Sequence, residues 1–454
     1  MGFREIFAKK RPVAEDLETP LFEGPADPPA TERDDSYFDM KHRIHSRLID
    51  EIHLPALDPL GPQEIFSEIR PAVERQLAVE NILFNDDEIR ALVMEIVNEL
   101  KGFGPLEPLL QDATVSDILC NSYRQVYVER FGMLEKTSVR FRDDDHLMTI
   151  IDRIVSRIGR RIDESSPMVD ARLPDGSRVN AIIPPLAIDG PSLSIRRFAV
   201  HPLHVKDLVR NQTLTDAIAE LLQGCVKARL NILISGGTGA GKTTLLNVLS
   251  SFIPDNERII TIEDSAELQM RQEHVVRLET RPPNIEGLGT VNQRDLVRNS
   301  LRMRPDRIVI GEVRGAEAFD MLQAMNTGHE GSLGTIHANT PRDSLTRMES
   351  MILTTGFNLP QNAMRFMLSS ALDMIIQISR FPDGTRKIKS ITEVVGMEGE
   401  IITLQDIFIF DKKGIDPNGK VIGQFKATGI RPKFAEKLEV AGIKIPENLF
   451  CSFP

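Results

Sequence analysis

The sequence predicts an α/β protein of several units, the last of which is a parallel-sheet domain that binds a nucleotide. Three observations lead to this prediction. The chain has 454 residues, more than one ordinary core holds, and 41% of them are hydrophobic. Residues 236–243 read GGTGAGKT, a full match to the phosphate-loop pattern G-x-x-x-x-G-K-[ST]. Apolar runs of strand length alternate with helical patterns in the second half of the chain.

Composition and spacing divide the chain into five segments. Residues 1–37 hold five prolines among many acids and predict a disordered tail, because such a composition buries too little apolar surface to offset its ordering entropy. A helical module follows over 38–100, then an α/β domain over 101–198. The polar, proline-containing segment 199–212 predicts a hinge, and the nucleotide domain occupies 213–454.

Local patterns place elements within the first two folded segments. Met40, Ile44, Leu48 and Ile52 fall four residues apart, which predicts one helix, and a second helical pattern runs over 89–100. The segment KGFGP ends that helix. The patterns beyond it predict, in order, a strand over 125–129, a helix over 147–158 and a strand over 178–183.

The phosphate loop has the flanks that such a loop requires. An apolar strand pattern precedes it over 230–235, and a helical pattern follows it over 244–249. We therefore expect backbone N–H groups and a helix N-terminus to hold the phosphates of a nucleoside triphosphate, ATP. Lys242 is expected to reach the β and γ phosphates, and Thr243 to bind Mg²⁺. The other expected nucleotide contacts are Gly236, Gly237, Thr238, Gly239, Ala240, Gly241 and Thr244.

Acidic residues follow two later strand patterns. The apolar run over 258–262 is followed directly by Glu263 and Asp264 and, further on, by Glu267. The apolar run over 307–311 is followed by Glu312. Carboxylates at the carboxyl ends of parallel strands face the ligand crevice. Glu263 is the candidate base for the attacking water, while Glu312, with Asp264, is the candidate Mg²⁺ ligand. The alternatives are a helix-capping acid for Asp264 and an exposed strand-end acid for Glu312.

Two histidines lie in a glycine-rich segment after Glu312. His329 and His337 flank a short strand pattern over 333–336. An imidazole near the γ-phosphate can respond to the presence of that phosphate, so both are catalytic candidates. Joint metal ligation is the alternative, but no third ligand has a convincing spacing.

Charge and cysteine content limit the function classes. The net charge of −11 and the pI near 5.5 argue against a general nucleic-acid coat. The three cysteines, Cys120, Cys225 and Cys451, lie far apart and predict reduced thiols. No apolar stretch approaches a membrane span and no secretory signal is apparent, so we expect a cytoplasmic protein.

The order of these clusters resembles the ATPases of the type II, type IV pilus and type IV secretion superfamily, in which they are termed the Asp box, the Walker B box and the His box. Residues 159–164, 170–180 and 301–306, together with the helical module, look like the Tad/Cpa pilus branch, the CpaF-like motors. The resemblance implies a homohexameric ring, with a PAS-like α/β N-terminal domain hinged to a RecA-like P-loop ATPase domain.

Arginines are further candidates, because ring ATPases use cationic side chains to stabilise charge on the transferred phosphoryl group. Arg302 and Arg304 precede the Walker B strand. Arg172 and Arg178 match a basic patch that the family folds over the nucleotide, and Arg196 and Arg197 are weaker candidates. The alternative for each is a solvated or salt-bridged surface arginine.

The leading functional hypothesis is an Mg²⁺-dependent ATP hydrolase that powers assembly of a Tad-type pilus, with retraction by the same motor as an open alternative. The resemblance implies that it works on inner-membrane platform proteins at the cytoplasmic face, reaching the membrane only through partners. The net charge of −11 predicts no direct binding of nucleic acid. A motor of a type IV secretion channel that moves DNA or protein effectors is the alternative. A third hypothesis is a nucleotide-dependent switch with little turnover.

Overall fold

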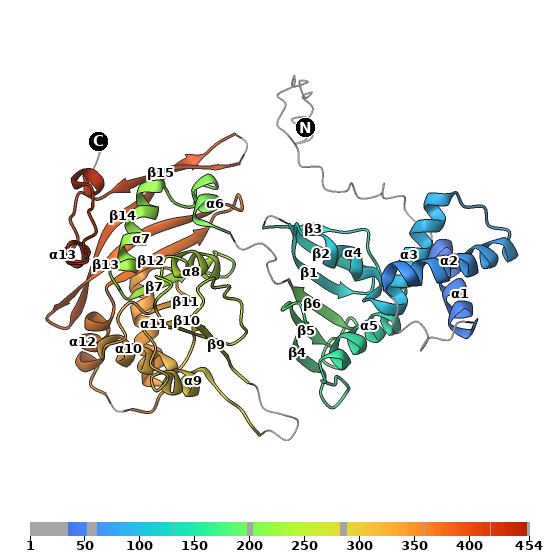
Figure 1. The fold of residues 1–454 in the computed structure, drawn as a ribbon, viewed down its shortest axis with the longest axis horizontal. Helices are drawn as coiled ribbons and strands as arrows, with labels where there is room; N and C mark the ends of the chain where they lie inside the picture. The colour runs from blue at the N-terminus through green and yellow to red at the C-terminus, as the bar shows by residue number, and fades with distance from the viewer. Residues whose placement is uncertain are drawn as a thin grey trace, which may run out of the picture. The chain divides into compact units, whose positions relative to one another are not determined.

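The computed structural model describes residues 35–51, 61–130, 132–197, 203–281, 288–357, 359–417 and 419–451 (Figure 1). The chain separates into two compact units, Met1–Pro105 and Leu106–Pro454. The tail predicted over 1–37 lies outside the described residues except for 35–37, which begin the first helix. Residues 199–202 of the predicted hinge also lie outside them.

The first unit is a small helical module. Its helices are α1 (Asp35–Glu51), α2 (Pro62–Val79) and α3 (Asp86–Lys101). Met40, Ile44 and Leu48 are buried together with apolar residues of α2 and α3, which confirms the spacing argument for these three residues. Ile52 lies outside the described residues. The helix α2 was not predicted, because Pro71 lies inside it. Burial of one apolar face of α2 holds this helix together despite the missing backbone donor.

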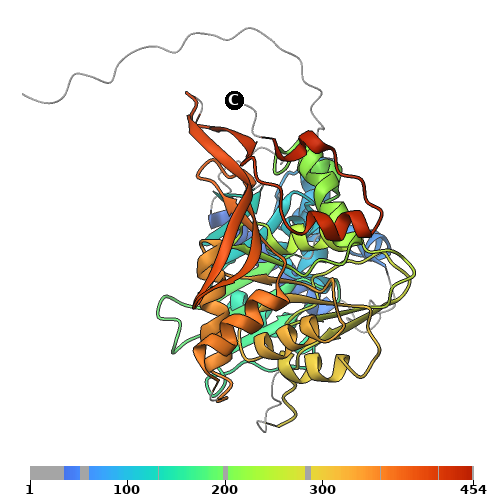
Figure 2. The same ribbon diagram turned by 90° about the vertical axis from the view of Figure 1, so that its left-hand side faces the viewer.

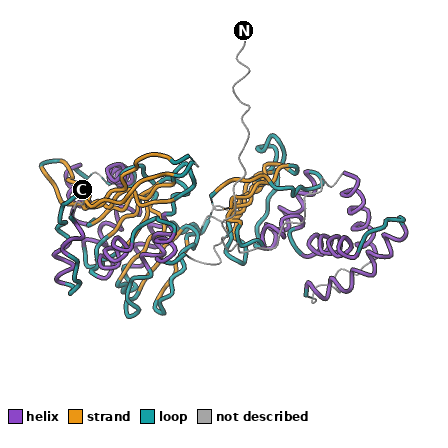
Figure 3. The backbone as a smooth tube through the Cα atoms, turned by 90° about the horizontal axis from the view of Figure 1, so that it is seen from above, coloured by secondary structure: helices purple, strands orange, loops and turns teal. Residues whose placement is uncertain are grey.

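The second unit begins with a six-stranded antiparallel sheet in the order β3-β2-β1-β6-β5-β4. The predicted elements at 125–129, 147–158 and 178–183 are confirmed as β2, α5 and β5, with ends shifted by one to three residues. Helix α5 lies beside the sheet (Figures 1 and 3). The elements are η2 (Gly104–Leu106), α4 (Glu107–Gln111), β1 (Val115–Ser122), β2 (Gln125–Arg130), β3 (Met133–Lys136), α5 (Asp144–Arg157), β4 (Met168–Arg172), β5 (Arg178–Ile182) and β6 (Ser192–Arg196).

A nine-stranded sheet follows, in the order β15-β14-β13-β12-β7-β11-β10-β8-β9. The strands are β7 (Ile232–Gly236), β8 (Ile259–Glu263), β9 (Val275–Glu279), β10 (Arg307–Val313), β11 (Leu333–Ile336), β12 (Met374–Arg380), β13 (Arg386–Glu398), β14 (Ile401–Ile415) and β15 (Val421–Ala427). Strands β7 to β12 pair in parallel, as predicted. The expectation of a parallel sheet up to the C-terminus was wrong, because β13, β14 and β15 form an antiparallel meander (Figure 2).

Helices cover both faces of the parallel part of this sheet. Ile232 and Ile234 of β7 are buried with residues of α7 and α8, whereas Leu233 between them is buried with residues of α10, α11 and α12. Near-continuous apolar strands of this kind require two covering layers. The helices are α6 (Val205–Arg210), α7 (Asp216–Lys227), α8 (Lys242–Ser250), α9 (Gln293–Ser300), α10 (Glu317–Asn326), α11 (Pro341–Leu353), α12 (Gln361–Ala371), α13 (Ala435–Val440) and η3 (Glu447–Phe450).

The fold also bears on the expectations for the hinge segment and for the cysteines. Within the segment predicted as a hinge, residues 205–210 form the short helix α6 rather than a loop. All three cysteines are free thiols, and Cys120 and Cys225 are buried. Among the residues that the structure describes, no helix combines the length and the apolar character needed to cross a bilayer.

Candidate functional site

The phosphate loop joins β7 to α8, as its flanks predicted. Gly236 ends the strand, where a methyl group would lie 2.5 Å from the carbonyl oxygen of Ile378. Gly239 and Gly241 have φ angles of 68° and 96°, which glycine adopts without strain. These glycines let the backbone turn sharply into α8, so the first N–H groups of the helix are left without intrahelical partners at the loop.

Lys242 and Thr243 occupy the first turn of α8. The Lys242 side chain is buried, and its Nζ donates to the Gly237 carbonyl at 3.1 Å. Burial lowers the pKa of Lys242, and the charge of Glu312 opposes that shift. An ammonium group held inside the loop in this way can pair with a phosphate that the loop encloses.

Sheet order brings the predicted acids to the same edge as the loop. Strands β7, β11, β10 and β8 are parallel neighbours in this order, so their carboxyl ends share one edge of the sheet. Glu263 ends β8, Glu312 lies near the end of β10, and His337 follows β11. The structure therefore groups these three residues with Lys242 and Thr243, an arrangement typical of ligand sites in α/β sheets.

Glu263 is held in an unusual environment for a carboxylate. Its side chain is 2% exposed, and Oε1 accepts hydrogen bonds from the N–H groups of Glu267 at 2.8 Å and Leu268 at 2.9 Å. Oε2 is buried, and no described group donates to it. Gly311 lies directly beside it, since a methyl group there would come within 2.9 Å of Cγ. Burial raises the pKa of Glu263 to about 7, against the two backbone hydrogen bonds.

Glu312 and Asp264 face one guanidinium group. Arg314 Nη2 lies 2.8 Å from Glu312 Oε2, and its Nη1 lies 3.4 Å from Asp264 Oδ2. His337 Nε2 lies 3.3 Å from Glu312 Oε1. Burial raises the pKa of Glu312, but the Arg314 hydrogen bond and the nearby charges outweigh it and lower this pKa overall. Burial and the Lys242 charge lower the pKa of His337, which favours its neutral form.

This donor set fits Mg²⁺ bound together with phosphates. Two carboxylates and the Thr243 hydroxyl supply the hard oxygen ligands that Mg²⁺ prefers, and phosphate oxygens and waters complete such a shell. The described residues contain no cluster of three or more His, Cys, Asp or Glu side chains able to hold a metal alone. Joint ligation by His329 and His337 also fails, because β11 separates them and places them at opposite ends of the strand.

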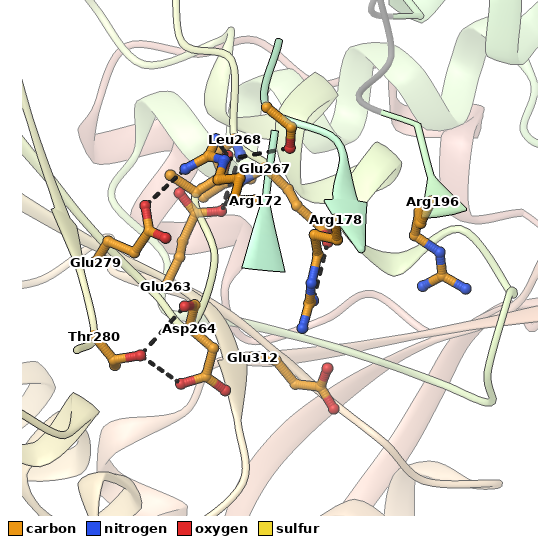
Figure 4. A network of polar contacts seen from close by, with 12 residues as sticks. Arg172, Arg178, Arg196, Glu263, Asp264, Glu267, Leu268, Glu279, Thr280 and Glu312 are labelled. Atoms are coloured by element: carbon orange, nitrogen blue, oxygen red, sulfur yellow. Dashed lines mark hydrogen bonds and ion pairs between the residues drawn. The ribbon is translucent and has the colours of Figure 1, made fainter. Parts of the chain in front are cut away.

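Three arginines of the six-stranded sheet form a row. Arg172, Arg178 and Arg196 are paired across β4, β5 and β6. Like charges in register repel one another, and acidic partners offset that repulsion. Arg172 lies 2.7 Å from Glu279 and donates to the Ala266 carbonyl, while Arg178 lies 3.4 Å from Glu267 (Figure 4). Arg172 and Arg178 of this row thus contact the segment that follows Glu263. The exposed guanidinium of Arg196 is paired with Asp117 at 2.9 Å.

The remaining candidates lie elsewhere. Arg197 donates to the carbonyls of Asp112 and Val115, so it supports the six-stranded sheet. Arg302 and Arg304 are exposed and precede β10, and His329 precedes β11. These three residues therefore lie at the amino ends of the strands, opposite the phosphate loop of their own chain.

Three arginines near the loop were missed by the sequence reasoning. Arg314 received no role from the sequence, although it follows Glu312 by two residues and bridges both candidate metal ligands. Arg380 and Arg386 flank the turn between β12 and β13, and Arg386 Nε donates to the Gly239 carbonyl at 2.9 Å. The segment PDGT between them is a turn signal, but its closeness to the phosphate loop depends on strand pairing.

Comparison with known proteins places these features in a family. The model of the family described as "Type II/IV secretion system protein" matches residues 99–402. A putative conjugal transfer protein of Mycobacterium tuberculosis is 38% identical over 325 residues, which are 70% of this chain and 92% of that protein. The conjugal transfer protein TrbB of Rhizobium radiobacter is 34% identical over 295 residues, or 64% and 86% of the two chains. The solved structure of the pilus retraction motor PilT with ADP has a TM-score of 0.46 and 21% identity, covering 72% of this chain and 82% of that one.

Proposed function

Because the chain belongs to the family of type II/IV secretion system proteins, we propose that it is an Mg²⁺-dependent ATP hydrolase that drives a secretion or pilus machine. One observation carries this proposal. The phosphate loop, Glu263, Glu312 and His337 meet at one edge of a parallel sheet, although up to 101 residues separate them in sequence. A phosphate-binding loop beside acids and an imidazole supplies what phosphoanhydride hydrolysis needs.

Each residue has a role that its surroundings support. Lys242 and the loop N–H groups bind the phosphates, and Thr243, Glu312 and Asp264 hold Mg²⁺, which neutralises phosphate charge when bound. Glu263, with its free Oε2 and raised pKa, orients and deprotonates the attacking water. Neutral His337 donates toward the γ-phosphate from its place beside Glu312. Arg172 and Arg178, which pair with Glu279 and Glu267, are assigned to binding of the nucleotide.

The positions of Arg302, Arg304 and His329 favour a role between subunits. They lie at the edge of the sheet opposite the phosphate loop of their own chain. In a head-to-tail ring, each subunit contacts the next through two different surfaces, so one edge of its sheet faces the opposite edge of the neighbouring sheet. We therefore assign them to the nucleotide of a neighbouring copy in a homohexamer. Mass measured in solution with and without Mg²⁺ and a non-hydrolysable ATP analogue tests this assignment, and a monomer under both conditions contradicts it.

Two machines fit the family, and each has its own support. The helical module over 35–101 and the Tad-like motifs support assembly of a Tad-type pilus. The module lies almost entirely outside the residues that the family model matches, and the net charge of −11 disfavours DNA handling. The relatives named as conjugal transfer proteins support a type IV secretion channel instead. In both cases the chain would act at the cytoplasmic face, through inner-membrane platform proteins.

One pair of measurements separates the two machines. ATP turnover of the purified protein is measured with and without single- and double-stranded DNA, and a strain lacking the gene is scored for surface pili and for conjugation. We expect turnover independent of DNA and loss of pili alone. Turnover that DNA stimulates, with loss of conjugation and intact pili, supports the channel. Nucleotide binding without turnover, with all partners present, supports a switch.

The raised pKa of Glu263 predicts the pH dependence of turnover. A base must be ionised to accept a proton, so kcat is expected to fall about tenfold for each pH unit below a pKa of about 7. The same shift affects folding. Because the folded chain keeps this proton to a higher pH than an exposed carboxyl does, Glu263 adds stability below about pH 4.5 that is lost as the pH rises through about 7. A kcat profile from about pH 5 to about pH 9 measures the effect on turnover, and an acidic limb near the ordinary carboxyl pKa contradicts the assignment.

A further inference from the structure

Arg380 and Arg386 form a cationic pair beside the phosphate loop that the proposed hydrolysis does not use. They face each other across the hairpin of β12 and β13. Like charges directly opposite each other destabilise a hairpin unless other groups hold them. Burial, with the charge of Arg380, lowers the pKa of Arg386, while Glu129 opposes this shift. The repulsion between the two guanidinium groups therefore lowers stability, and we expect other contacts of the pair to offset it.

On one side, the pair holds the phosphate loop. Arg386 Nε donates to the Gly239 carbonyl at 2.9 Å, and its Cδ lies 3.2 Å from where a methyl group on Gly241 would be. Arg380 Nη1 lies 3.4 Å from the corresponding position on Gly239. The Gly239 carbonyl thus accepts a hydrogen bond from a charged donor that lies outside the loop.

On the other side, the pair contacts the hairpin of β2 and β3 in the six-stranded sheet. Arg380 Nη2 donates to the carbonyl of Gly132. Arg386 Nη2 lies 4.0 Å from Glu129 Oε1, close enough for an ion pair across the two sheets. One guanidinium group, that of Arg386, therefore connects an acid of the six-stranded sheet to the backbone of the phosphate loop.

We propose that Arg386, supported by Arg380, is a positioning residue that fixes the shape of the phosphate loop and couples nucleotide affinity to the β2–β3 hairpin through Glu129. The inference rests on the proposed ATP site and goes beyond it. Preorganising a loop lowers the cost of binding, so loss of this contact weakens nucleotide binding. The chemical step at Glu263 does not involve Arg386, so kcat at saturating ATP changes little.

The test is equilibrium binding of a fluorescent, non-hydrolysable ATP analogue with Mg²⁺ to the full chain. Arg386→Gln is expected to raise the Kd about tenfold, as loss of a hydrogen bond from a charged donor does. Arg386→Lys keeps the charge and is expected to recover part of that loss. Glu129→Gln is expected to raise the Kd about threefold in the native background but by less than about 1.5-fold in Arg386→Gln, because the two residues act through one contact. Arg210→Gln on α6, whose side chain is 76% exposed, is the matched control.

Each outcome decides a different question. Native-like affinity in Arg386→Gln overturns the positioning role, as does a fall in kcat as large as the rise in Kd. An equal effect of Glu129→Gln in both backgrounds overturns the coupling. If circular dichroism shows that Arg386→Gln does not fold, the same comparison is made with Arg386→Lys, alone and combined with Glu129→Gln. A native chain that binds no analogue refutes the ATP site itself.

Discussion

Replacing Glu263 by Gln is expected to lower kcat for ATP hydrolysis by roughly 10²- to 10⁴-fold while leaving nucleotide affinity within about threefold. The amide keeps the size of the side chain and can still accept hydrogen bonds from Glu267 and Leu268. It cannot accept the proton of the attacking water. A group needed only in the transition state contributes to kcat and not to ground-state binding, so the two constants separate.

Steady-state phosphate release and binding of a non-hydrolysable analogue measure the two constants. The control is Glu273→Gln, an exposed acid in the segment between β8 and β9, which is expected to leave both unchanged. Near-normal turnover in Glu263→Gln contradicts the assignment of this residue as the base. Equal losses of turnover and affinity point instead to a structural role for the buried carboxyl group.

Replacing Arg307 by Met is expected to lower the free energy of unfolding by about 3 to 5 kcal/mol. Arg307 is fully buried and pairs with Glu257 through two nitrogens, at 2.6 and 3.2 Å. It also donates to the Gly331 carbonyl at 3.1 Å. Removing the guanidinium leaves the Glu257 carboxylate buried, with Arg229 at 3.2 Å as its one remaining charged partner among the described residues.

Urea unfolding followed by circular dichroism measures this loss. Adding Glu257→Leu to Arg307→Met is expected to recover part of it, because apolar replacement of a whole buried pair costs far less than breaking the pair. Arg210→Met on α6 is the control, with an expected effect within about 0.5 kcal/mol. Unchanged stability in Arg307→Met would mean that the charge of the buried Glu257 carboxylate is compensated without Arg307. Since Arg307 begins β10 at the end opposite the phosphate loop, nucleotide affinity of the folded variant should stay native.

Local signals in the sequence predicted most of the elements that build the site. Strand, loop and helix around residues 236–243 are confirmed, because an apolar run, a glycine-rich turn and a helical pattern each act within a few residues. The same is true of the strand that ends at Glu263 and of the strand that carries Glu312 near its end. The helix α2 was missed where Pro71 contradicts the local pattern and long-range burial decides the outcome. The antiparallel meander was missed although the PDGT turn between β12 and β13 is a local hairpin signal, because the sequence reasoning did not use that turn.

The sequence by itself therefore determined which side chains are available and at which strand ends they lie. Only the tertiary structure decided which of them meet. Parallel pairing in the order β7-β11-β10-β8 brings His337 to Glu312 and leaves His329, Arg302 and Arg304 at the far edge. Pairing of β12 with β7 brings Arg386 to the Gly239 carbonyl. The physical reason is that strand order and register are fixed by contacts between distant segments, whose energies no short window of sequence contains.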